Sequence, residues 1–322
     1  MAGKIYVYHH NDHDGIVAAG VLYNLYKKAV REEQFVFNMI DYNTILNFDH
    51  IDFTAGDHVF FLDYSFSNKH NVEEFKKLLS RRESYNDTNV VWIDHHKTSV
   101  ESELNSLFQI AGIRLNGLCG AALTYMYLNI EEFMEDIKSR DMMPDIFHKR
   151  DDIPRFLKYI DDYDCWKHLY RETNDFHYGF TISNPNDEIL SILLCKSPDT
   201  EMETMISRYI SCICQNGETV QEFLKFENKE YHVDMYGFEY TLPEEHGGYK
   251  CFCMNRKGNS LMFGDKINEY DAVIPFYFDG KRWTYSMFSN KDHIDCSEVA
   301  KSYGGGGHKG AAGWTSDKLL LV

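Results

Sequence analysis

The sequence lacks Cys-x-x-Cys pairs, a secretory signal pattern and long apolar runs, and each absence argues against a class of protein. None of its 8 cysteines forms a Cys-x-x-Cys pair, so neither a common zinc site nor a disulfide framework is indicated. No run approaches the ~18 apolar residues that a membrane span requires, and the N-terminus shows no secretory signal pattern. We therefore expect reduced thiols in a cytoplasmic protein that does not bind membranes.

Positive charge is also scarce. The chain has 33 lysines and arginines against 50 aspartates and glutamates, which gives a net charge of −17. Such an acidic protein repels an extended polyanion, so tight binding to long duplex nucleic acid is disfavoured. A short or small phosphorylated substrate stays compatible with this charge, because bound metal cations would supply positive charge locally.

The first half of the chain alternates strand and helix patterns. Continuous apolar strands that alternate with helices predict an α/β domain with a mainly parallel sheet covered by helices. We expect strands at 5–8, 35–40, 59–62 and 90–93, and helices at 16–29, 72–79 and 117–130.

The second half has a different organisation. A helical pattern runs from 200 to about 232, and β-rich runs separated by glycine turns follow it. At 322 residues, two domains are expected. We place a first domain at 1–195, a helical linker at 196–235 and a smaller α+β domain at 236–322.

Acidic and histidine residues follow three of the expected strands. Because ligands bind beyond the carboxyl ends of the strands in a parallel sheet, we expect these side chains to meet. Carboxylates and imidazoles suit Mn²⁺ or Mg²⁺ better than a thiolate-binding metal. Two such ions would clamp a phosphate and activate water, which predicts a metal-dependent phosphoesterase. The residues are His10, Asp12 and Asp14 after the first strand, Asp63 after the third, and Asp94, His95 and His96 after the fourth.

Two further segments have ligand character. The stretch Asp161-Asp162-Tyr163-Asp164 offers more carboxylates, of which Asp162 and Asp164 compete for one role. Near the C-terminus, Gly305-Gly306-Gly307-His308 is too rich in glycine for a helix interior. Glycines let backbone N–H groups approach a phosphate closely, so we expect this loop to bind substrate. A merely flexible loop is the alternative.

Together these motifs resemble the DHH/DHHA1 phosphoesterase family over nearly the whole chain, and in particular its branch of nanoRNases, oligoribonucleases and single-strand exonucleases. Asp94-His95-His96 resembles the triplet that gives the family its name. The family's first motif is similar to His10-x-Asp12-x-Asp14-Gly15, its second to Asp63 and its fourth to Asp162. Gly305-Gly306-Gly307-His308 resembles the hallmark of the DHHA1 domain.

The resemblance implies a role for each of these residues. His96 would contact the scissile phosphate and Asp94 would support the histidines, while Asp63 would bridge two Mn²⁺ ions. Asp161 and Asp164 stay open as alternatives to Asp162. One ion would be held by His10, Asp12 and Asp63, and the other by Asp14, Asp63, His95 and Asp162. The rest of the substrate would be bound by Gly305, Gly306, Gly307 and His308.

The leading functional hypothesis is a manganese-dependent phosphodiesterase, with Mg²⁺ as an alternative ion. It would hydrolyse short oligonucleotides or dinucleotides to nucleoside monophosphates with a water activated by two metals. Two alternative functions are compatible with the sequence. One is a small-nucleotide phosphatase or cyclic-dinucleotide phosphodiesterase, and the other is a nucleotide-binding sensor without enzymatic activity. A homodimer is left open.

Overall fold

The structure is a computed structural model that describes residues 3–27, 30–82, 89–133, 142–183, 187–195, 198–227 and 236–321. Its contacts divide the chain into two compact units, Met1–Gln221 and Glu222–Val322. None of the described helices is long and apolar enough to cross a membrane.

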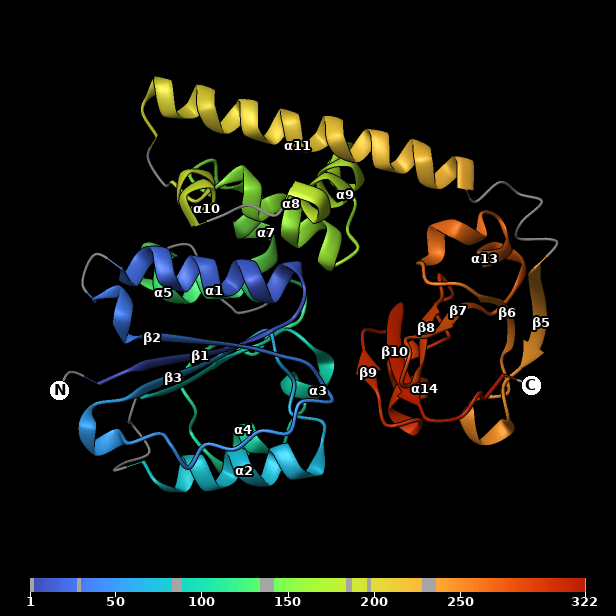
Figure 1. Cartoon of the computed structure of the whole chain (residues 1–322), viewed down its shortest axis with the longest axis horizontal. Coiled ribbons are helices and arrows are strands. Elements are labelled where there is room, and N and C mark those ends of the chain that lie inside the picture. Colours follow the sequence, from blue (N-terminus) through green and yellow to red (C-terminus); the bar gives the residue numbers. More distant parts are fainter. Residues whose placement is uncertain are drawn as a thin grey trace. The chain divides into compact units, whose positions relative to one another are not determined.

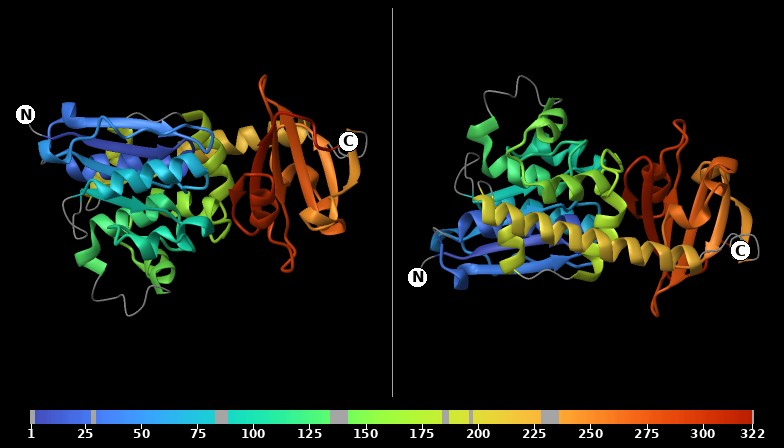
Figure 2. Two further views of the ribbon diagram at one scale, coloured as in Figure 1. Left: turned by 90° about the horizontal axis from the view of Figure 1, so that it is seen from below. Right: turned by 90° about the horizontal axis from the view of Figure 1, so that it is seen from above.

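The first unit is built on a four-stranded sheet in which every strand pair is parallel. The strand order is β2-β1-β3-β4, so β1 lies between strands that follow it in the chain. The predicted α/β class with a mainly parallel sheet is confirmed. Figures 1 and 2 show this sheet in blue to teal, with strands β1 (Ile5–His10), β2 (Phe35–Ile40), β3 (His58–Leu62) and β4 (Val90–Ile93).

Helices cover both faces of this sheet, because the strands present apolar side chains to both. Along β1, Val7 faces one core while Tyr6 and Tyr8 face another, as the period of two in a strand requires. Helices α1 and α5 lie on the Val7 side, and α2 and α4 lie on the opposite side (Figure 1). These helices are α1 (His13–Tyr26), α2 (Lys69–Ser80), α4 (Leu104–Leu107) and α5 (Gly120–Leu128).

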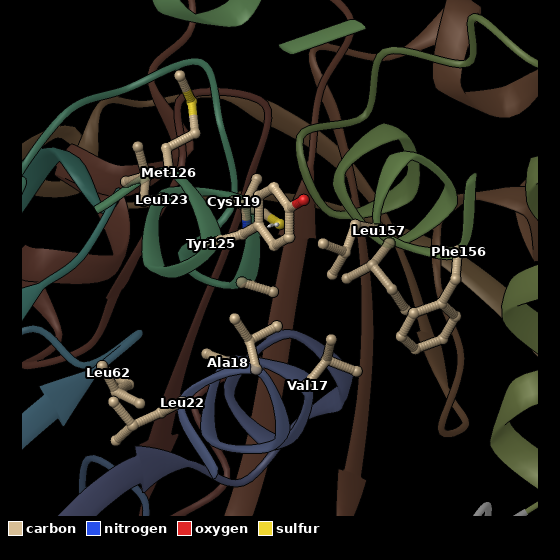
Figure 3. Close-up of a cluster of buried hydrophobic side chains, with 14 of the residues drawn as sticks. Val17, Ala18, Leu22, Leu62, Cys119, Leu123, Tyr125, Met126, Phe156 and Leu157 are labelled. Atoms are coloured by element: carbon tan, nitrogen blue, oxygen red, sulfur yellow. Dashed lines mark hydrogen bonds between the residues drawn. The ribbon is translucent and has the colours of Figure 1, made fainter. Parts of the chain in front are cut away.

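The larger core joins α1 and α5 to helices from later in the chain. Val17 and Ala18 of α1 pack with Leu123 of α5 and Leu157 of α8 (Figure 3). The small residues of α1 and α5 let the two helix backbones approach closely. Further α-helices described in this unit are α3 (Lys97–Val100), α6 (Ile130–Phe133), α7 (Met143–Lys149), α8 (Arg155–Asp164), α9 (Thr173–Ser183) and α10 (Asp187–Leu193).

The long helix α11 (Thr200–Glu227) lies where a helical linker is expected. Its residues Ile210 and Ile213 are buried in the core of the first unit. Of the expected linker, residues 196–197 and 228–235 lie outside the described residues. The domain limits drawn from the sequence stay a prediction.

The second unit contains a six-stranded sheet in the order β5-β6-β7-β8-β10-β9. Only β6 and β7 pair in parallel among its described strands. Helix α14 (Cys296–Ser302) packs against β8, β9 and β10, and α13 (Lys266–Glu269) packs against β7. This α+β arrangement agrees with the expected fold of the C-terminal part. The strands are β5 (Gly237–Thr241), β6 (Lys250–Asn255), β7 (Ala272–Phe278), β8 (Trp283–Phe288), β9 (Gly306–Gly307) and β10 (Ala311–Ser316).

Candidate metal centre

The turn between β1 and α1 holds the first two ligand candidates. Asp12 is the N-cap of α1 and accepts a hydrogen bond from the Gly15 backbone N–H at 2.9 Å. A Cβ atom at Gly15 would lie 2.4 Å from the carbonyl oxygen of His10, so only glycine fits this turn. Nδ1 of His10 lies 2.6 Å from Oδ2 of Asp12. Burial acts against a charged His10, but Asp12 and Asp63 raise its pKa to about 11.

Asp63 belongs to two groups of potential ligands, one with His10 and Asp12 and one with Asp94, His95 and His96. It directly follows β3 with a left-handed φ of 54°, and its backbone N–H donates to the Ile93 carbonyl at 2.9 Å. The carboxylate is buried, and neither of its oxygens has a well-aligned hydrogen-bond partner. Imidazole nitrogens lie nearby at 3.7 Å in His10, 3.2 Å in His95 and 3.8 Å in His96. Burial alone would raise the pKa of Asp63, but His10 and His95 hold it below its usual range.

The end of β4 places two histidines around one buried aspartate. Oδ1 of Asp94 lies 2.8 Å from Nδ1 of His96 and accepts a hydrogen bond from the His95 backbone N–H at 2.8 Å. The hydroxyl of Ser99 donates to its other oxygen. Asp94 therefore orients the His96 ring, as a carboxylate commonly does for a functional imidazole.

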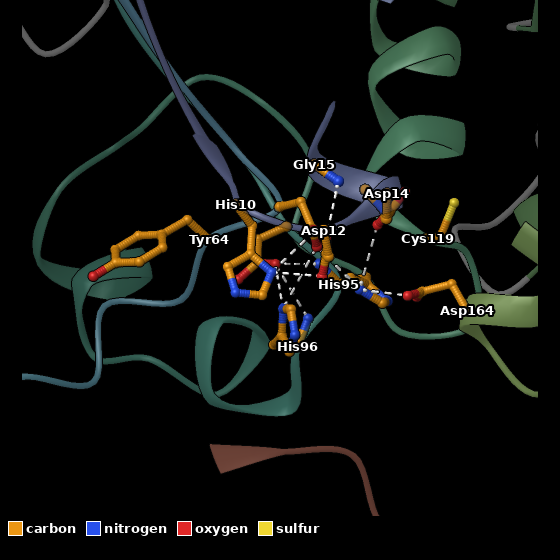
Figure 4. A network of polar contacts seen from close by, with 12 residues as sticks. His10, Asp12, Asp14, Gly15, Tyr64, His95, His96, Cys119 and Asp164 are labelled. Atoms are coloured by element: carbon orange, nitrogen blue, oxygen red, sulfur yellow. Dashed lines mark hydrogen bonds and ion pairs between the residues drawn. The ribbon is translucent and has the colours of Figure 1, made fainter. Parts of the chain in front are cut away.

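His95 contacts three carboxylates at once. Its Nε2 atom lies 3.2 Å from Oδ1 of Asp63, 3.3 Å from Oδ2 of Asp164 and 3.7 Å from Oδ2 of Asp14 (Figure 4). Burial and the charges of Asp63 and Asp164 raise the pKa of Asp14 well above its ordinary value. Burial raises the pKa of Asp164 to about 7, since the favourable charge of His95 is opposed by Asp63 and Asp12. The site therefore concentrates negative charge away from water.

Asp14 is fixed by the N-terminus of α5. Its two carboxylate oxygens accept hydrogen bonds from the backbone N–H groups of Gly120 at 2.5 Å and Ala121 at 2.7 Å, and the positive end of the helix dipole favours this arrangement. A Cβ atom at Gly120 would lie 2.6 Å from Cβ of Asp63 and 3.0 Å from Oδ2 of Asp14. Glycine is therefore required here for α5 to reach the cluster.

The assignment of Asp162 as a ligand needs correction. Its carboxylate accepts hydrogen bonds from the backbone N–H groups of Leu169 at 2.8 Å and Tyr170 at 3.2 Å, and from the hydroxyl of Thr173. It belongs to none of the His and Asp groups that the described residues form around the cluster. Asp164, one of the two alternatives, lies beside His95 in a group that also contains Cys165.

The other alternative, Asp161, contacts residues that flank the cluster. It is fully buried and accepts a hydrogen bond from the Cys119 backbone N–H, directly before α5, at 2.7 Å. Its other oxygen lies 2.5 Å from Nζ of Lys167 and 2.6 Å from Nε2 of His148. Asp161 thereby ties the start of α5 to α7 and to the segment after α8.

Sequence reasoning missed Tyr42, which follows β2. Its hydroxyl lies 3.3 Å from Nε2 of His96, and its ring centroid lies 5.1 Å from that of His10. The ring stacks on Tyr64, whose hydroxyl accepts a hydrogen bond from the buried Asn71 amide at 3.1 Å. The position of Tyr42 after a strand was the available signal, but a tyrosine there does not stand out as the carboxylates do.

The glycine loop of the second unit forms a tight hairpin. Gly306 and Gly307 pair with β10, and the His308 backbone N–H donates to the Ala311 carbonyl at 2.7 Å. A Cβ atom at Gly305 would lie 2.1 Å from the carbonyl oxygen of Gly313, whereas one at Gly306 would meet no atom within 4 Å. Close packing therefore explains why residue 305 is glycine, but it does not explain why residue 306 is glycine. The expected substrate-binding role of Gly305, Gly306, Gly307 and His308 stays a prediction.

The cluster fits divalent cations. Ligand atoms within 4.8 Å of one another form one group of His10, Asp12 and Asp63, and a second that contains Asp63, Asp94, His95 and His96. The buried oxygens of Asp63 have no well-aligned hydrogen-bond partner, and a buried carboxylate normally requires one. A cation would also offset the repulsion that raises the pKa of Asp14 and Asp164. The residues present can therefore hold metal, and Asp63 is common to both groups.

Comparison with known proteins agrees with this arrangement. Residues 4–148 match the model of the DHH family, N-terminal domain, so this part of the chain is a DHH-family domain. An uncharacterized protein from Acanthamoeba polyphaga mimivirus is 22% identical over 236 residues, which cover 69% of this chain and 46% of that protein. The chain thus spans about half the length of this relative.

Two solved structures align with almost the whole chain. The structure of RecJ in complex with Mn²⁺ from Thermus thermophilus has a TM-score of 0.51 and 14% identity, over 99% of this chain and 50% of RecJ. It shows a shared fold. An exopolyphosphatase-related protein from Bacteroides fragilis aligns with a TM-score of 0.44 and 12% identity, over 99% of this chain and 88% of that one.

Proposed function

We propose that this chain, with its DHH-family domain at residues 4–148, is a phosphodiesterase that depends on two divalent cations. Mn²⁺ is the preferred ion, and Mg²⁺ is able to replace it. The substrates are short oligonucleotides or dinucleotides, and the products are nucleoside monophosphates. The observation that carries the proposal is the buried Asp63 carboxylate, which belongs to two of the groups of potential ligands among the described residues.

The residues divide naturally between two ions around Asp63. His10 and Asp12 would complete one set, and His95 with Asp164 would complete the other, with Asp14 next to it. When bound, such a pair supplies Lewis-acid polarisation of the phosphoryl group and activation of the attacking water. Imidazole and carboxylate donors, with no required thiolate, favour Mn²⁺ or Mg²⁺. The RecJ structure that shares this fold was solved with Mn²⁺.

His96 is the group of the chain that would bind the phosphate. Burial opposes a charged imidazole, but Asp94 raises the pKa of His96 above its usual value. A protonated His96 keeps Nδ1 on Asp94 and directs Nε2 toward the Tyr42 hydroxyl at 3.3 Å. A phosphoryl oxygen near this point would accept a hydrogen bond from Nε2, and the bond would strengthen as negative charge develops in the transition state.

The net charge of the protein favours a short substrate. The net charge of −17 opposes long polyanions, so few phosphates should contact the protein. The glycine loop is proposed to bind a further part of the substrate. Gly306→Val tests this role with little effect on folding, because the space beside Gly306 is open. A raised KM for a dinucleotide with unchanged thermal stability is the expected result, and an unchanged KM would exclude the role.

A substrate panel tests the proposal as a whole. Dinucleotides, short RNA and DNA, 3′-phosphoadenosine 5′-phosphate, cyclic dinucleotides and pyrophosphate are incubated with Mn²⁺, with Mg²⁺ and with a chelator, and Asp63→Asn serves as the control. Release of nucleoside monophosphates from dinucleotides or short strands only with metal is the expected result. Preferred hydrolysis of a cyclic dinucleotide or of a phosphomonoester would replace the proposed substrate class, and no hydrolysis at all would favour a nucleotide sensor.

A further inference from the structure

The segment between α8 and α9 exposes two rings on an unusual backbone. Trp166 and His168 have left-handed φ angles of 54° and 50°. Bulky residues rarely adopt this conformation, and it persists only where the surroundings enforce it, often at binding sites. Both residues are exposed, and Trp166 is 44% accessible.

Two buried carboxylates enforce this backbone. Asp162 accepts hydrogen bonds from the Leu169 and Tyr170 backbone N–H groups, and its own carbonyl accepts from the Lys167 N–H at 2.9 Å. Asp161 lies 2.5 Å from Nζ of Lys167. Both aspartates are completely buried. The core of the protein therefore holds the segment in a conformation that presents an indole and an imidazole to solvent.

The exposed rings are the outer end of a continuous series of ring contacts. The centroids of Trp166 and His168 lie 4.5 Å apart, and those of Trp166 and Tyr163 lie 5.5 Å apart. Tyr163 stacks on His177 with centroids 3.4 Å apart and an interplanar angle of 8°. His177 in turn lies 4.9 Å from the ring of His13.

Two residues of this series of rings are neighbours in the sequence of residues in the candidate metal centre. His13 lies between Asp12 and Asp14 in the sequence, and Tyr163 directly precedes Asp164. Trp166 is two residues beyond Asp164, so their Cα atoms are within about 7 Å of each other. Oδ2 of Asp164 lies 3.3 Å from His95. Cys165, directly before Trp166, has its thiol within 4.8 Å of ligand atoms of His95 and Asp164, so this segment lies beside the cluster.

We propose that Trp166 forms a stacking surface for a nucleobase of the substrate, with the His168 ring beside it at an interplanar angle of 80°. The inference rests on the proposed function, because the base is located by a phosphate bound at the metal centre. A π-face on every base lets such a surface bind without strong base preference. The chemical class of the ligand is a nucleotide, and the part recognised here is its base and not its sugar.

Binding of AMP and of ribose 5-phosphate tests the proposal, since the second compound has the phosphate and sugar but no base. Isothermal titration calorimetry in the presence of Mn²⁺ compares the wild type with Trp166→Ala, Trp166→Phe and Leu169→Ala. Leu169 is the matched control because it is an exposed apolar side chain of the same segment. Thermal unfolding verifies that each variant is folded.

The wild type should bind AMP more tightly than ribose 5-phosphate, and Trp166→Ala should weaken AMP binding by about tenfold. Ribose 5-phosphate should bind equally to both, Trp166→Phe should restore most of the affinity, and Leu169→Ala should leave it unchanged. Equal binding of AMP and ribose 5-phosphate by the wild type, or an AMP affinity that survives Trp166→Ala, would overturn the stacking surface. Because no hydrolysis is required, failure of the substrate panel leaves this result interpretable.

Discussion

Oδ1 of Asp94 lies 2.8 Å from Nδ1 of His96, whereas the neighbouring His95 points its Nε2 atom at three other carboxylates. Two adjacent histidines of one triplet therefore have different partners. His95 is surrounded by the groups that would hold metal, and His96 is held by Asp94 with its second nitrogen near Tyr42.

This difference predicts different consequences for the two alanine variants. His95→Ala should lower both metal content and turnover, because it removes a ligand. His96→Ala should retain most of the metal and lower turnover by on the order of 10²-fold, the usual effect of losing one positioned donor to the developing charge. Metal analysis and kinetics of the purified proteins check this, and equal loss of metal from both would refute the division.

The corrected assignment predicts opposite behaviour for two aspartates of one helix. Asp164→Asn should weaken Mn²⁺ binding at least about tenfold and leave the fold intact. Asp162→Asn should instead lower the free energy of unfolding by about 2 kcal/mol, because it weakens hydrogen bonds to a buried charge. Mn²⁺ titration and urea unfolding of both variants decide the matter, and the reverse pattern would restore Asp162 as the ligand.

The raised pKa of Asp164 also predicts that the stability of the metal-free protein depends on pH. Its pKa is raised from 3.8 to about 7, so the folded protein binds this proton more tightly than the unfolded chain. The contribution to stability is complete below pH 4 and is lost as the pH rises through 7. In the presence of a chelator, the free energy of unfolding of Asp164→Asn relative to wild type should therefore rise between pH 5 and 8. A difference that stays constant over this range would contradict the account.

Gly120 should be intolerant of a single methyl group. Gly120→Ala would place Cβ 2.6 Å from Cβ of Asp63, so α5 must move away from the cluster and Mn²⁺ binding should fall. Gly20→Ala in α1 is the matched control, because its Cβ would meet only Leu190 at 3.4 Å and alanine favours a helix interior. Thermal unfolding with and without Mn²⁺ measures both effects. Similar Mn²⁺-induced stabilisation in the two variants would show that the close contact is unimportant.

Much of the site was predictable because strand ends are visible in a sequence. His10, Asp63 and Asp94 each follow an apolar run, and parallel pairing brings those ends to one edge. Which aspartate of the stretch 161–164 lies beside His95 could not be predicted in this way. Asp161 and Asp164 are three residues apart and share one side of α8, whereas Asp162 is turned away from it. Which side faces the cluster depends on how α8 packs, and no local pattern records that.

Two other features could not be predicted from the sequence, for different reasons. Strand β9 consists of Gly306 and Gly307, residues with little preference for strands, so only pairing with β10 defines it. Tyr42 reaches the site because Asn71, in α2, binds the Thr44 carbonyl and the Leu46 N–H of the same loop. This contact joins residues that are far apart in the sequence.

The central claim is that Asp63 bridges two divalent cations, and crystallography with anomalous scattering at the Mn edge tests it most directly. Crystals grown with Mn²⁺ should show two anomalous peaks, each within coordination distance of a different oxygen of Asp63, and Asp63→Asn should lose at least one of them together with most of the phosphodiesterase activity. A single peak, or two peaks of which neither contacts Asp63, would contradict the account.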